Sequence, residues 1–359
     1  MQLIKRVVKF IFKVWAATTI GTIVFMIMTI GSLVAIVAIA SSIADDDLQD
    51  SEVVYGEDFA DHAFVSIPIN GVIMGDRSST SDWLELLSES GVVYGYEVKD
   101  QLRKLAEDDE VDGVILEINS PGGTIFGSQA IADGVEYYRD KAKKPVVAFI
   151  SNMAASGGFW SAVSADYIVA DAGTMVGSIG VIFGPLKYYD GVKSEDGGVF
   201  IGGVQTTGGI ETEYITAGTS KDLGNPYRRL TSEERAHLQT MVDGSYDQFV
   251  TYVAERRKID AGQIRSTIGA LVYDELQAKE LGLIDWHGNK ESAYDLLASK
   301  ADVAPDDYKI IRELSPDAIL QSLFARASFV SGRQASSPLC SLQSSVLAFY
   351  GATTVQCGR

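Results

Sequence analysis

The chain has 359 residues and a formal net charge of −18, so it can hold one large α/β domain with a membrane segment and a tail, or at most two domains. Every acidic residue follows residue 43. An acidic body does not condense on phosphate backbones, and no basic stripe with interleaved aromatic residues is present. We therefore expect no nucleic-acid partner.

The N-terminus carries a long apolar run, because residues 14–40 contain no charged residue. A helix of about 20 apolar residues spans a bilayer core. Four lysine and arginine residues precede the run and acidic residues 45–47 follow it, so segment 1–43 is predicted to be a single-pass inner-membrane anchor with a cytoplasmic N-terminus and a periplasmic body. The alternative is a cleaved signal peptide, since residues 38–40 and 42–44 offer small-residue cleavage patterns, but its apolar core would be only about 7–15 residues long.

Residues 44–62 are acidic and polar, which favours a solvated stalk. Short apolar strands then alternate with helical patterns, which is typical of a parallel sheet with crossover helices. The expected strands are 63–73, 111–119 and 145–151, the expected helices are 97–111, 128–144, 274–282 and 290–301, residues 76–92 read as a loop, and 159–182 as a helical turn leading into further strands. A long amphipathic helix is expected over 232–258, with a capping pattern at Thr231 or Ser232. These limits predict one domain over 63–301 and a serine-rich extension over 302–359.

Both cysteines of the chain, Cys340 and Cys357, lie in this extension. In an extracytoplasmic compartment they could form a disulfide, and two unpaired thiols are equally compatible with the sequence. No metal-ligand pattern lies between them, so we expect no metal site, and no other motif implies a cofactor.

Three glycine-rich segments each follow an expected strand. They are NSPGGTIFGS (119–128), MAASGGFWSA (153–162) and GSIGVI (177–182). None ends in the Gly-Lys-Ser/Thr of a Walker loop, and none fits the dinucleotide fingerprint. Glycines after parallel strands allow tight turns and let backbone N–H groups point into a cavity.

Ser156 stands between a strand and a helix in the second segment, which is where an exposed nucleophile belongs. The N–H of Gly157 could then bind the oxyanion of an attacked carbonyl, with Gly122 or Gly123 as a second donor. A serine in this position is equally typical of an ordinary helix N-cap.

A nucleophilic serine needs a base. The histidines are His62, His237 and His287, and none lies in or shortly after the glycine-rich segments. A lysine can serve when burial and a lack of counter-charge favour its neutral form. Lys221 follows an expected strand on a glycine-containing connection, although an exposed loop lysine beside Asp222 is the simpler interpretation.

The order NSPGG, MAASGGFW, GSIGV, AGTSKDLGNPYRRLTSEER and VYDELQAKELGLID resembles the bacterial signal peptide peptidase SppA family and its SohB-like relatives over roughly 63–300. The resemblance implies an α/β ClpP/crotonase-like fold of repeated β-β-α units. It also implies a Ser-Lys dyad with Ser156 as nucleophile and Lys221 as base. Ser178 could orient the lysine amine, although a turn serine is as compatible. The chain departs from the family pattern at Ser220, where an aromatic residue is usual, and by an insertion around 193–209.

The resemblance further implies a membrane-anchored endopeptidase that degrades cleaved signal peptides and forms a homo-oligomer. A crotonase-type acyl-CoA enzyme shares the fold but needs no serine nucleophile. A membrane scaffold that has lost hydrolysis is the third possibility. Misplacement of Ser156 or Lys221 would favour the scaffold, and peptide hydrolysis by Ser156→Ala and Lys221→Ala variants separates the three.

Overall fold

The computed structural model describes a large part of the chain beyond residue 50. The described residues are 51–77, 91–184, 186, 217, 219–225, 228–305, 307–313 and the backbone of 346–349, together with residues 19, 21, 22, 25–28, 30 and 31. The chain divides into two compact units, Met1–Asp50 and Ser51–Arg359.

In the first unit the described residues are helical, and the hydroxyl of Thr22 donates to the carbonyl oxygen of Thr19 at 2.9 Å. No helix among the residues described for this chain is long and apolar enough to cross a bilayer. Most of the expected anchor over 14–40, and both cysteines, lie outside the described residues.

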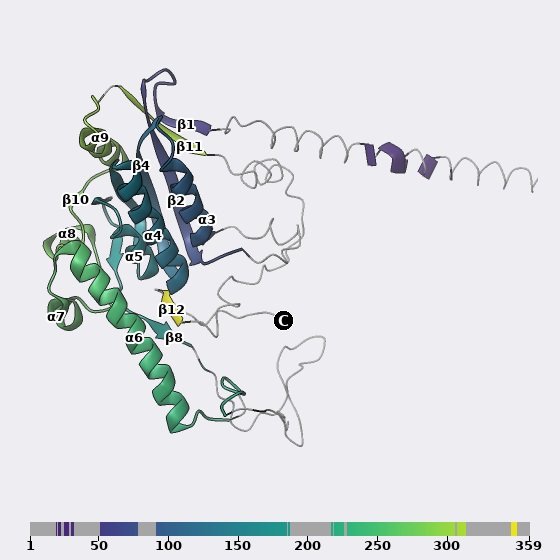
Figure 1. Ribbon diagram of the computed structural model, residues 1–359, viewed down its shortest axis with the longest axis vertical. Helices are drawn as coiled ribbons and strands as arrows, with labels where there is room; N and C mark the ends of the chain where they lie inside the picture. The colour runs from purple at the N-terminus through teal and green to yellow at the C-terminus, as the bar shows by residue number, and fades with distance from the viewer. Residues whose placement is uncertain are drawn as a thin grey trace, which may run out of the picture. The chain divides into compact units, whose positions relative to one another are not determined.

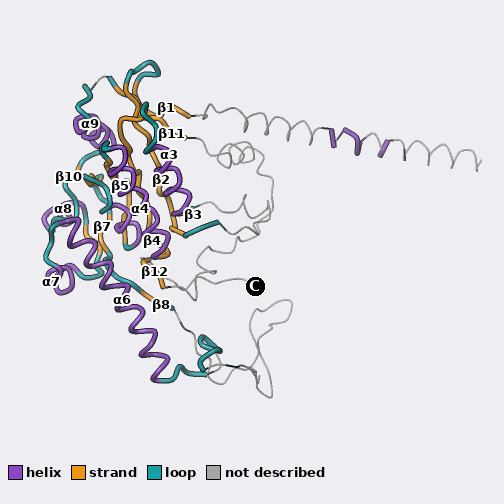
Figure 2. The backbone as a smooth tube through the Cα atoms, viewed as in Figure 1, coloured by secondary structure: helices purple, strands orange, loops and turns teal. Residues whose placement is uncertain are grey.

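The second unit is built on one twisted, mostly parallel sheet (Figures 1 and 2). Its main strand order is β1-β11-β2-β4-β5-β6-β10, and β2, β4, β5 and β6 run parallel. These strands are β1 (Ser51–Gly56), β2 (His62–Met74), β4 (Val111–Thr124), β5 (Val146–Ala155), β6 (Tyr167–Ala170), β10 (Trp286–His287) and β11 (Tyr308–Glu313). The short strands β3 (Val92–Tyr94), β7 (Met175–Gly177), β8 (Ile182–Phe183), β9 (Val272–Tyr273) and β12 (Val346–Phe349) pair beside this path.

Helices follow the strands in the expected alternation. They are α3 (Gly95–Leu105), α4 (Ile125–Ala142), α5 (Gly157–Ala162), α6 (Ser232–Arg257), α7 (Ala261–Gln263), a π-helical turn η1 (Ile264–Ile268), α8 (Glu275–Glu280) and α9 (Lys290–Lys300). The predicted capping pattern of α6 is confirmed: Thr231 and Glu234 form a reciprocal capping box. α3 ends six residues before its predicted limit, and turns over 106–110 lead into β4.

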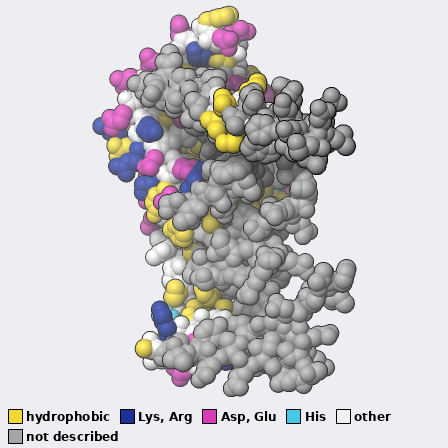
Figure 3. Space-filling view, turned by 90° about the vertical axis from the view of Figure 1, so that its right-hand side faces the viewer, with side chains coloured by type: hydrophobic (Ala, Val, Ile, Leu, Met, Phe, Trp, Pro, Cys, Tyr) yellow, Lys and Arg dark blue, Asp and Glu magenta, His cyan; other side chains and the backbone are white. Residues whose placement is uncertain are grey.

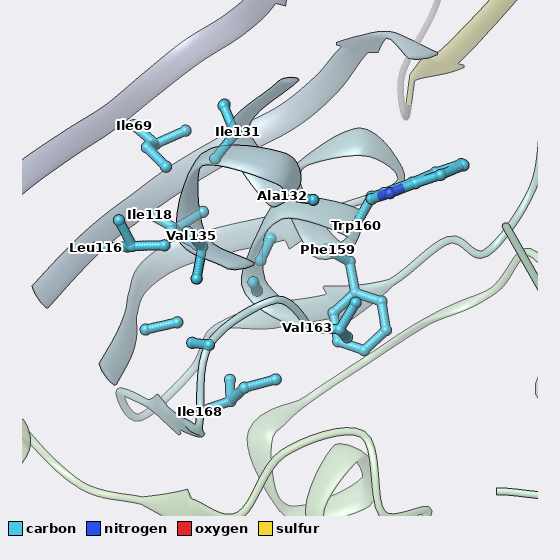
Figure 4. Close-up of a cluster of buried hydrophobic side chains, with 14 of the residues drawn as sticks. Ile69, Leu116, Ile118, Ile131, Ala132, Val135, Phe159, Trp160, Val163 and Ile168 are labelled. Atoms are coloured by element: carbon cyan, nitrogen blue, oxygen red, sulfur yellow. The ribbon is translucent and has the colours of Figure 1, made fainter. Parts of the chain in front are cut away.

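Side chains alternate between the two faces of the sheet, as strand geometry requires. On β4, Val114, Leu116 and Ile118 face the main core, and Ile115 faces a second cluster. Figure 4 shows β2 and β4 side chains packed with those of α4 and α5 in the main core. α9 supplies the second cluster through Tyr294 and Leu297. Buried on both faces, β4 holds its C-terminal glycine loop on a rigid support.

Two strands of the sheet lie outside the expected domain range of 63–301. β1 lies within the expected stalk, 44–62, and β11 lies within the expected extension, 302–359. β1 pairs antiparallel with β11. β11 also pairs in parallel with β2, the first long strand of the sheet. Acidic residues interrupt the apolar pattern of these strands, so the sequence alone did not indicate them. In the described sheet, each of the two strands is paired only with strands distant in the sequence. On the face shown in Figure 3, the described acidic side chains are interspersed with lysine and arginine.

Glu117 is a charged group on the α9 face of β4, and its side chain is only 12% exposed. It accepts hydrogen bonds from Lys290 at 2.8 Å, Arg312 at 3.0 Å, Ser66 at 2.8 Å and Tyr294 at 2.9 Å. Burial alone would raise the pKa of Glu117, but the hydrogen bonds from Lys290 and Ser66 and the nearby positive charges outweigh it and lower the pKa. The carboxylate thus ties β4 to β2, β11 and α9.

Replacing Glu117 by alanine is expected to lower the free energy of unfolding by about 2–3 kcal/mol, because it removes a carboxylate that serves two cations. The pKa of Glu117 in the folded protein lies below its ordinary value of 4.5, so the charged carboxylate stabilises the folded protein fully at pH values above 4.5. This stabilisation is lost as the pH falls through the folded-state pKa. Urea unfolding at neutral and acid pH measures the effect, with exposed Glu107→Ala as control. Equal losses for the two variants at neutral pH would contradict this role.

Candidate active site

Ser156 follows β5 directly and is the N-cap residue of α5. Its φ is +54° and ψ is −117°, a backbone conformation that is strained for a residue with a Cβ. Its hydroxyl is buried and donates to the carbonyl oxygen of Gly180 at 3.2 Å. The Ser156 hydroxyl makes no bond to its own helix, so the cap interpretation does not explain this residue.

The third glycine-rich segment lies beside the second. β5 and β7 pair in parallel, with Ala155 opposite Gly177, and the N–H of Ser156 donates to the carbonyl oxygen of Gly177 at 2.8 Å. Ser178 follows directly after β7 and also has a positive φ, +53°. Its own N–H donates to the carbonyl oxygen of Leu271 at 2.7 Å. The fold therefore brings Ser156 and Ser178 to neighbouring positions.

The first glycine-rich segment forms the end of β4 and packs against α5. Ser120 is buried, and its hydroxyl donates to the carbonyl oxygen of Gly71 at 2.6 Å and accepts from the N–H of Gly122 at 3.1 Å. Gly122 thus already uses its N–H. Gly157 opens α5, and the N–H of a first helical residue has no partner within its helix. Of the three expected oxyanion donors, Gly122 is thus the one whose N–H is bound to a side chain.

Gly158 sets the distance between α5 and this segment. A Cβ at residue 158 would lie 2.6 Å from the backbone oxygen of Ser120. Gly158→Ala is therefore expected to lower the free energy of unfolding by about 1–3 kcal/mol, since α5 or the segment must shift. Thermal unfolding measures this against Gly244→Ala, where a Cβ meets nothing within 4 Å on the exposed face of α6. The control should be neutral or stabilising, and a neutral result for Gly158→Ala would refute the close packing.

Residues 346–349 form a strand beside this site. β12 pairs antiparallel with the end of β4, placing Leu347, Ala348 and Phe349 opposite Thr124, Gly123 and Gly122. It also pairs antiparallel with β8, and it lies next to α5. Figures 1 and 2 show β12 between the ends of these elements. An extended segment can therefore lie between β4 and β8, hydrogen-bonded along both edges and alongside the helix that Ser156 begins.

Lys221 lies on a turn that precedes α6. The turn is closed by bonds from the N–H of Leu223 to Ser220 O and from the N–H of Asn225 to Asp222 O, both at 3.0 Å. Lys221 is exposed, and the hydrogen bond found for the Ser156 hydroxyl in the described part of the chain goes to Gly180 and not to the lysine amine. In Figure 1 the turn lies beyond the first residues of α6, apart from α5. The pairing of Ser156 with Lys221 therefore stays a prediction.

The sequence analysis missed a set of charged residues around this turn. Arg228 makes paired hydrogen bonds to Asp222 (2.7 and 2.6 Å) and to Glu234 (2.8 and 2.7 Å). Hydrogen bonds from Arg228 hold the pKa values of both carboxyl groups at about 2, so both are charged at neutral pH. The capping box at Thr231 and Glu234 was visible in the sequence. The contact of Glu234 with Arg228, which in turn binds Asp222 beside Lys221, was not.

The histidines lie away from Ser156. His62 begins β2 and its Nδ1 lies 2.8 Å from Asp112 Oδ2, at the end of the sheet opposite to the one where β5 reaches Ser156. A strand of 13 residues spans roughly 40 Å, so this pair cannot orient Ser156. His237 and His287 are exposed on α6 and β10. The described geometry supports no Ser-His pair.

Aromatic packing fixes α5 to α6. The Trp160 ring stacks on Phe249 at 4.6 Å and on Tyr252 at 5.7 Å between centroids. Arg256 donates to the carbonyl oxygens of Val163 at 3.0 Å and Ala165 at 3.1 Å, just beyond the C-terminal end of α5. The helix that begins at Ser156 thus has a firm support, which sequence periodicity alone did not reveal.

Comparison with known proteins identifies the family. The family model described as peptidase family S49 matches residues 138–304, a segment that begins before Ser156 and includes Lys221. A relative from Synechocystis sp., whose name describes it as a protease, slr0021, is 31% identical over 220 residues, which are 61% of this chain and 74% of that protein. The chain belongs to peptidase family S49.

Other S49 relatives differ more in length. A Methanocaldococcus jannaschii protein, MJ0651, also named as a protease, is 37% identical over 56% of this chain, and an Enterococcus faecium protein named as a signal peptide peptidase SppA is 33% identical over 65%. The chain spans 60% and 62% of their lengths. Similar solved structures include a ClpP1 mutant from Listeria monocytogenes (TM-score 0.39, 15% identity, 64% of this chain and 93% of that one). A mutant of the membrane-bound stomatin-specific protease 1510-N gives a TM-score of 0.40 at 14% identity, over 71% of this chain and 99% of that one.

Proposed function

We propose that this S49 peptidase is a serine endopeptidase in which Ser156 attacks the scissile carbonyl and Lys221 acts as general base. The observation that carries the proposal is the strained, non-capping conformation of Ser156 between two glycine-rich segments. A neutral Lys221 amine takes the proton from the Ser156 hydroxyl as its oxygen attacks the scissile carbonyl, and the N–H groups of Gly157 and Gly123 bind the oxyanion of the tetrahedral intermediate. When this intermediate collapses, the C–N bond breaks, the protonated Lys221 gives its proton to the leaving amine, and the acyl group stays on Ser156. Water, activated by the same amine, then hydrolyses the acyl-enzyme. Ser178, next to Ser156, can accept or donate a bond that orients the amine.

The position of β12 supports an extended peptide as substrate. Peptides that add a strand to existing edges are held by main-chain hydrogen bonds, with side-chain pockets giving selectivity. A substrate strand between β4 and β8 would pass the two glycine-rich segments, and it needs the place that residues 346–349 hold here.

A chain that ends at residue 345 is therefore expected to have a lower KM for an apolar peptide than the full chain, with kcat little changed. Steady-state hydrolysis measures both constants. A peptide with the sequence of residues 343–352 should act as a competitive inhibitor of the shortened chain. An unchanged KM together with no inhibition would show that β12 does not occupy the substrate-binding site.

Substrate class and location rest on the sequence. The apolar run over 14–40 favours an anchor in the inner membrane with the peptidase outside it, where signal peptides left after cleavage are at hand. We propose these peptides as substrates, a homo-oligomer as the working form and the ClpP/crotonase-like arrangement as the fold. Protease accessibility from each side of a membrane vesicle tests the topology.

Hydrolysis of an apolar fluorogenic peptide separates the proposed function from its rivals. The full chain is compared with variants that lack the Ser156 hydroxyl or the Lys221 amine. Activity in the full chain and its loss in both variants support the dyad. A folded full chain without hydrolysis favours the scaffold, and turnover of an acyl-CoA that survives both substitutions favours a crotonase-type enzyme.

A further inference from the structure

The turn that carries Lys221 is fastened on both sides of the lysine. Asp222 is held by Arg228 through two hydrogen bonds, and Ser220 bonds to the carboxylate of Glu234. Ser220 has a positive φ of +61°, which is uncommon for a residue other than glycine. The lysine side chain therefore projects from a backbone whose neighbours are both fixed to the start of α6.

Arg228 is the centre of this cluster, and all five of its N–H donors are used. Four go to Asp222 and Glu234, and the fifth goes to the carbonyl oxygen of Arg229 at 3.2 Å. The side chain of Glu234 is only 3% exposed, and it also accepts from the N–H of Thr231 at 2.9 Å. Only a guanidinium fork can serve two carboxylates in this manner, and an ammonium group cannot.

The cluster also determines which charged groups can pair with the Lys221 amine. The charged groups beside the lysine on the turn and in the first turn of α6 are Asp222, Arg228, Arg229, Glu233, Glu234 and Arg235. Asp222, the carboxylate adjacent to the lysine, has both oxygens bound by Arg228. A free carboxylate in that position would pair with the amine and favour its protonated form, which cannot act as a base.

From this geometry we infer that Arg228 is a positioning residue for catalysis: it fixes the Lys221 turn to α6 and keeps Asp222 from pairing with the lysine amine. The inference rests on the proposed role of Lys221 as base. It assigns a task to a residue that touches neither the substrate nor the reacting atoms.

The test is the pH profile of kcat/KM for an apolar peptide, measured from about pH 6 to pH 10 on the full chain. In Arg228→Gln, Asp222 is released to pair with Lys221, and the acid limb moves up by about one pH unit, which lowers kcat/KM about tenfold at pH 7. Activity at alkaline pH stays within about threefold of wild type. Asp222 and Glu234 stay charged across this range, so the limb does not report their titration.

Three further variants separate this role from simple loss of structure. Adding Asp222→Asn to Arg228→Gln removes the competing carboxylate, and the limb returns to its wild-type position. Arg228→Lys keeps the charge but binds one carboxylate, which gives an intermediate shift. Arg235→Gln, an equal loss of charge at an exposed site on α6, leaves the profile unchanged. A limb that stays shifted in the double variant, or an unshifted limb with lower activity at every pH, would overturn the inference.

A second measurement does not depend on hydrolysis. In chains carrying Ser156→Ala, reductive methylation of Lys221 is followed by mass spectrometry as a function of pH. The pH of half-labelling rises by about one unit with Arg228→Gln and returns with the added Asp222→Asn. This result would stand even if Lys221 proved not to be the base. Unshifted labelling would refute the role of Arg228 and leave the dyad untouched.

Discussion

Ser156→Ala is expected to lower kcat for peptide hydrolysis by at least about a thousandfold, because no other group can form the acyl-enzyme. Alanine keeps the Cβ, so the backbone at φ +54° carries the same strain as in the wild type. The variant loses one hydrogen bond, to Gly180, and thermal unfolding should therefore shift little. The loss is thus predicted in the chemical step and not in the fold.

Ser151→Ala is the matched control for this prediction. Ser151 lies on the same strand and is exposed, and its hydroxyl is 3.5 Å from the carbonyl oxygen of Ile118. Its hydrolysis rate should equal that of the wild type. If Ser156→Ala retains wild-type activity, the nucleophile has been misassigned.

Lys221→Ala is expected to reduce kcat by about two to four orders of magnitude, the range for loss of a general base. Lys104→Ala, which removes an exposed lysine on α3, should have no effect. Because the Lys221 amine must be unprotonated to accept a proton, activity of the wild type should rise with pH along one limb, and this limb should be absent from the residual activity of Lys221→Ala. Similar pH profiles for the two proteins would argue against the assignment.

The two proposed dyad residues can also come from two different copies of the chain. In a homo-oligomer with head-to-tail interfaces, the lysine of one copy can reach the serine of the next. An equal mixture of inactive Ser156→Ala and Lys221→Ala chains, unfolded and refolded together, should then recover about a quarter of wild-type activity by random assembly. Recovery of none would show instead that the turn and Ser156 of a single chain come together on substrate binding.

The position of Ser156 between a strand and a helix could be predicted from the sequence, because residues close to it in the chain define that position. Three glycine-rich segments follow parallel strands, and strand ends of a parallel sheet meet at one edge, so Ser156 and Ser178 had to come close. The start of α6 was equally readable, because a capping box involves residues only three positions apart. The sequence position of His62 also predicted that it lies away from Ser156. His62 begins β2, at the end of the sheet opposite to the one where β5 reaches Ser156.

What the sequence by itself determined is the α/β class, the strand-helix alternation and the position of Ser156 between a strand and a helix, all set by short-range periodicity and turn chemistry. Only the tertiary structure decided the limits of the sheet, because β1 and β11 are complete only when paired with each other and with β2. It alone showed that Gly122 already uses its N–H, that Arg228 serves two carboxylates around Lys221, and that 346–349 pairs beside Ser156. These are contacts between groups far apart in the chain or dependent on exact side-chain direction, which periodicity does not encode.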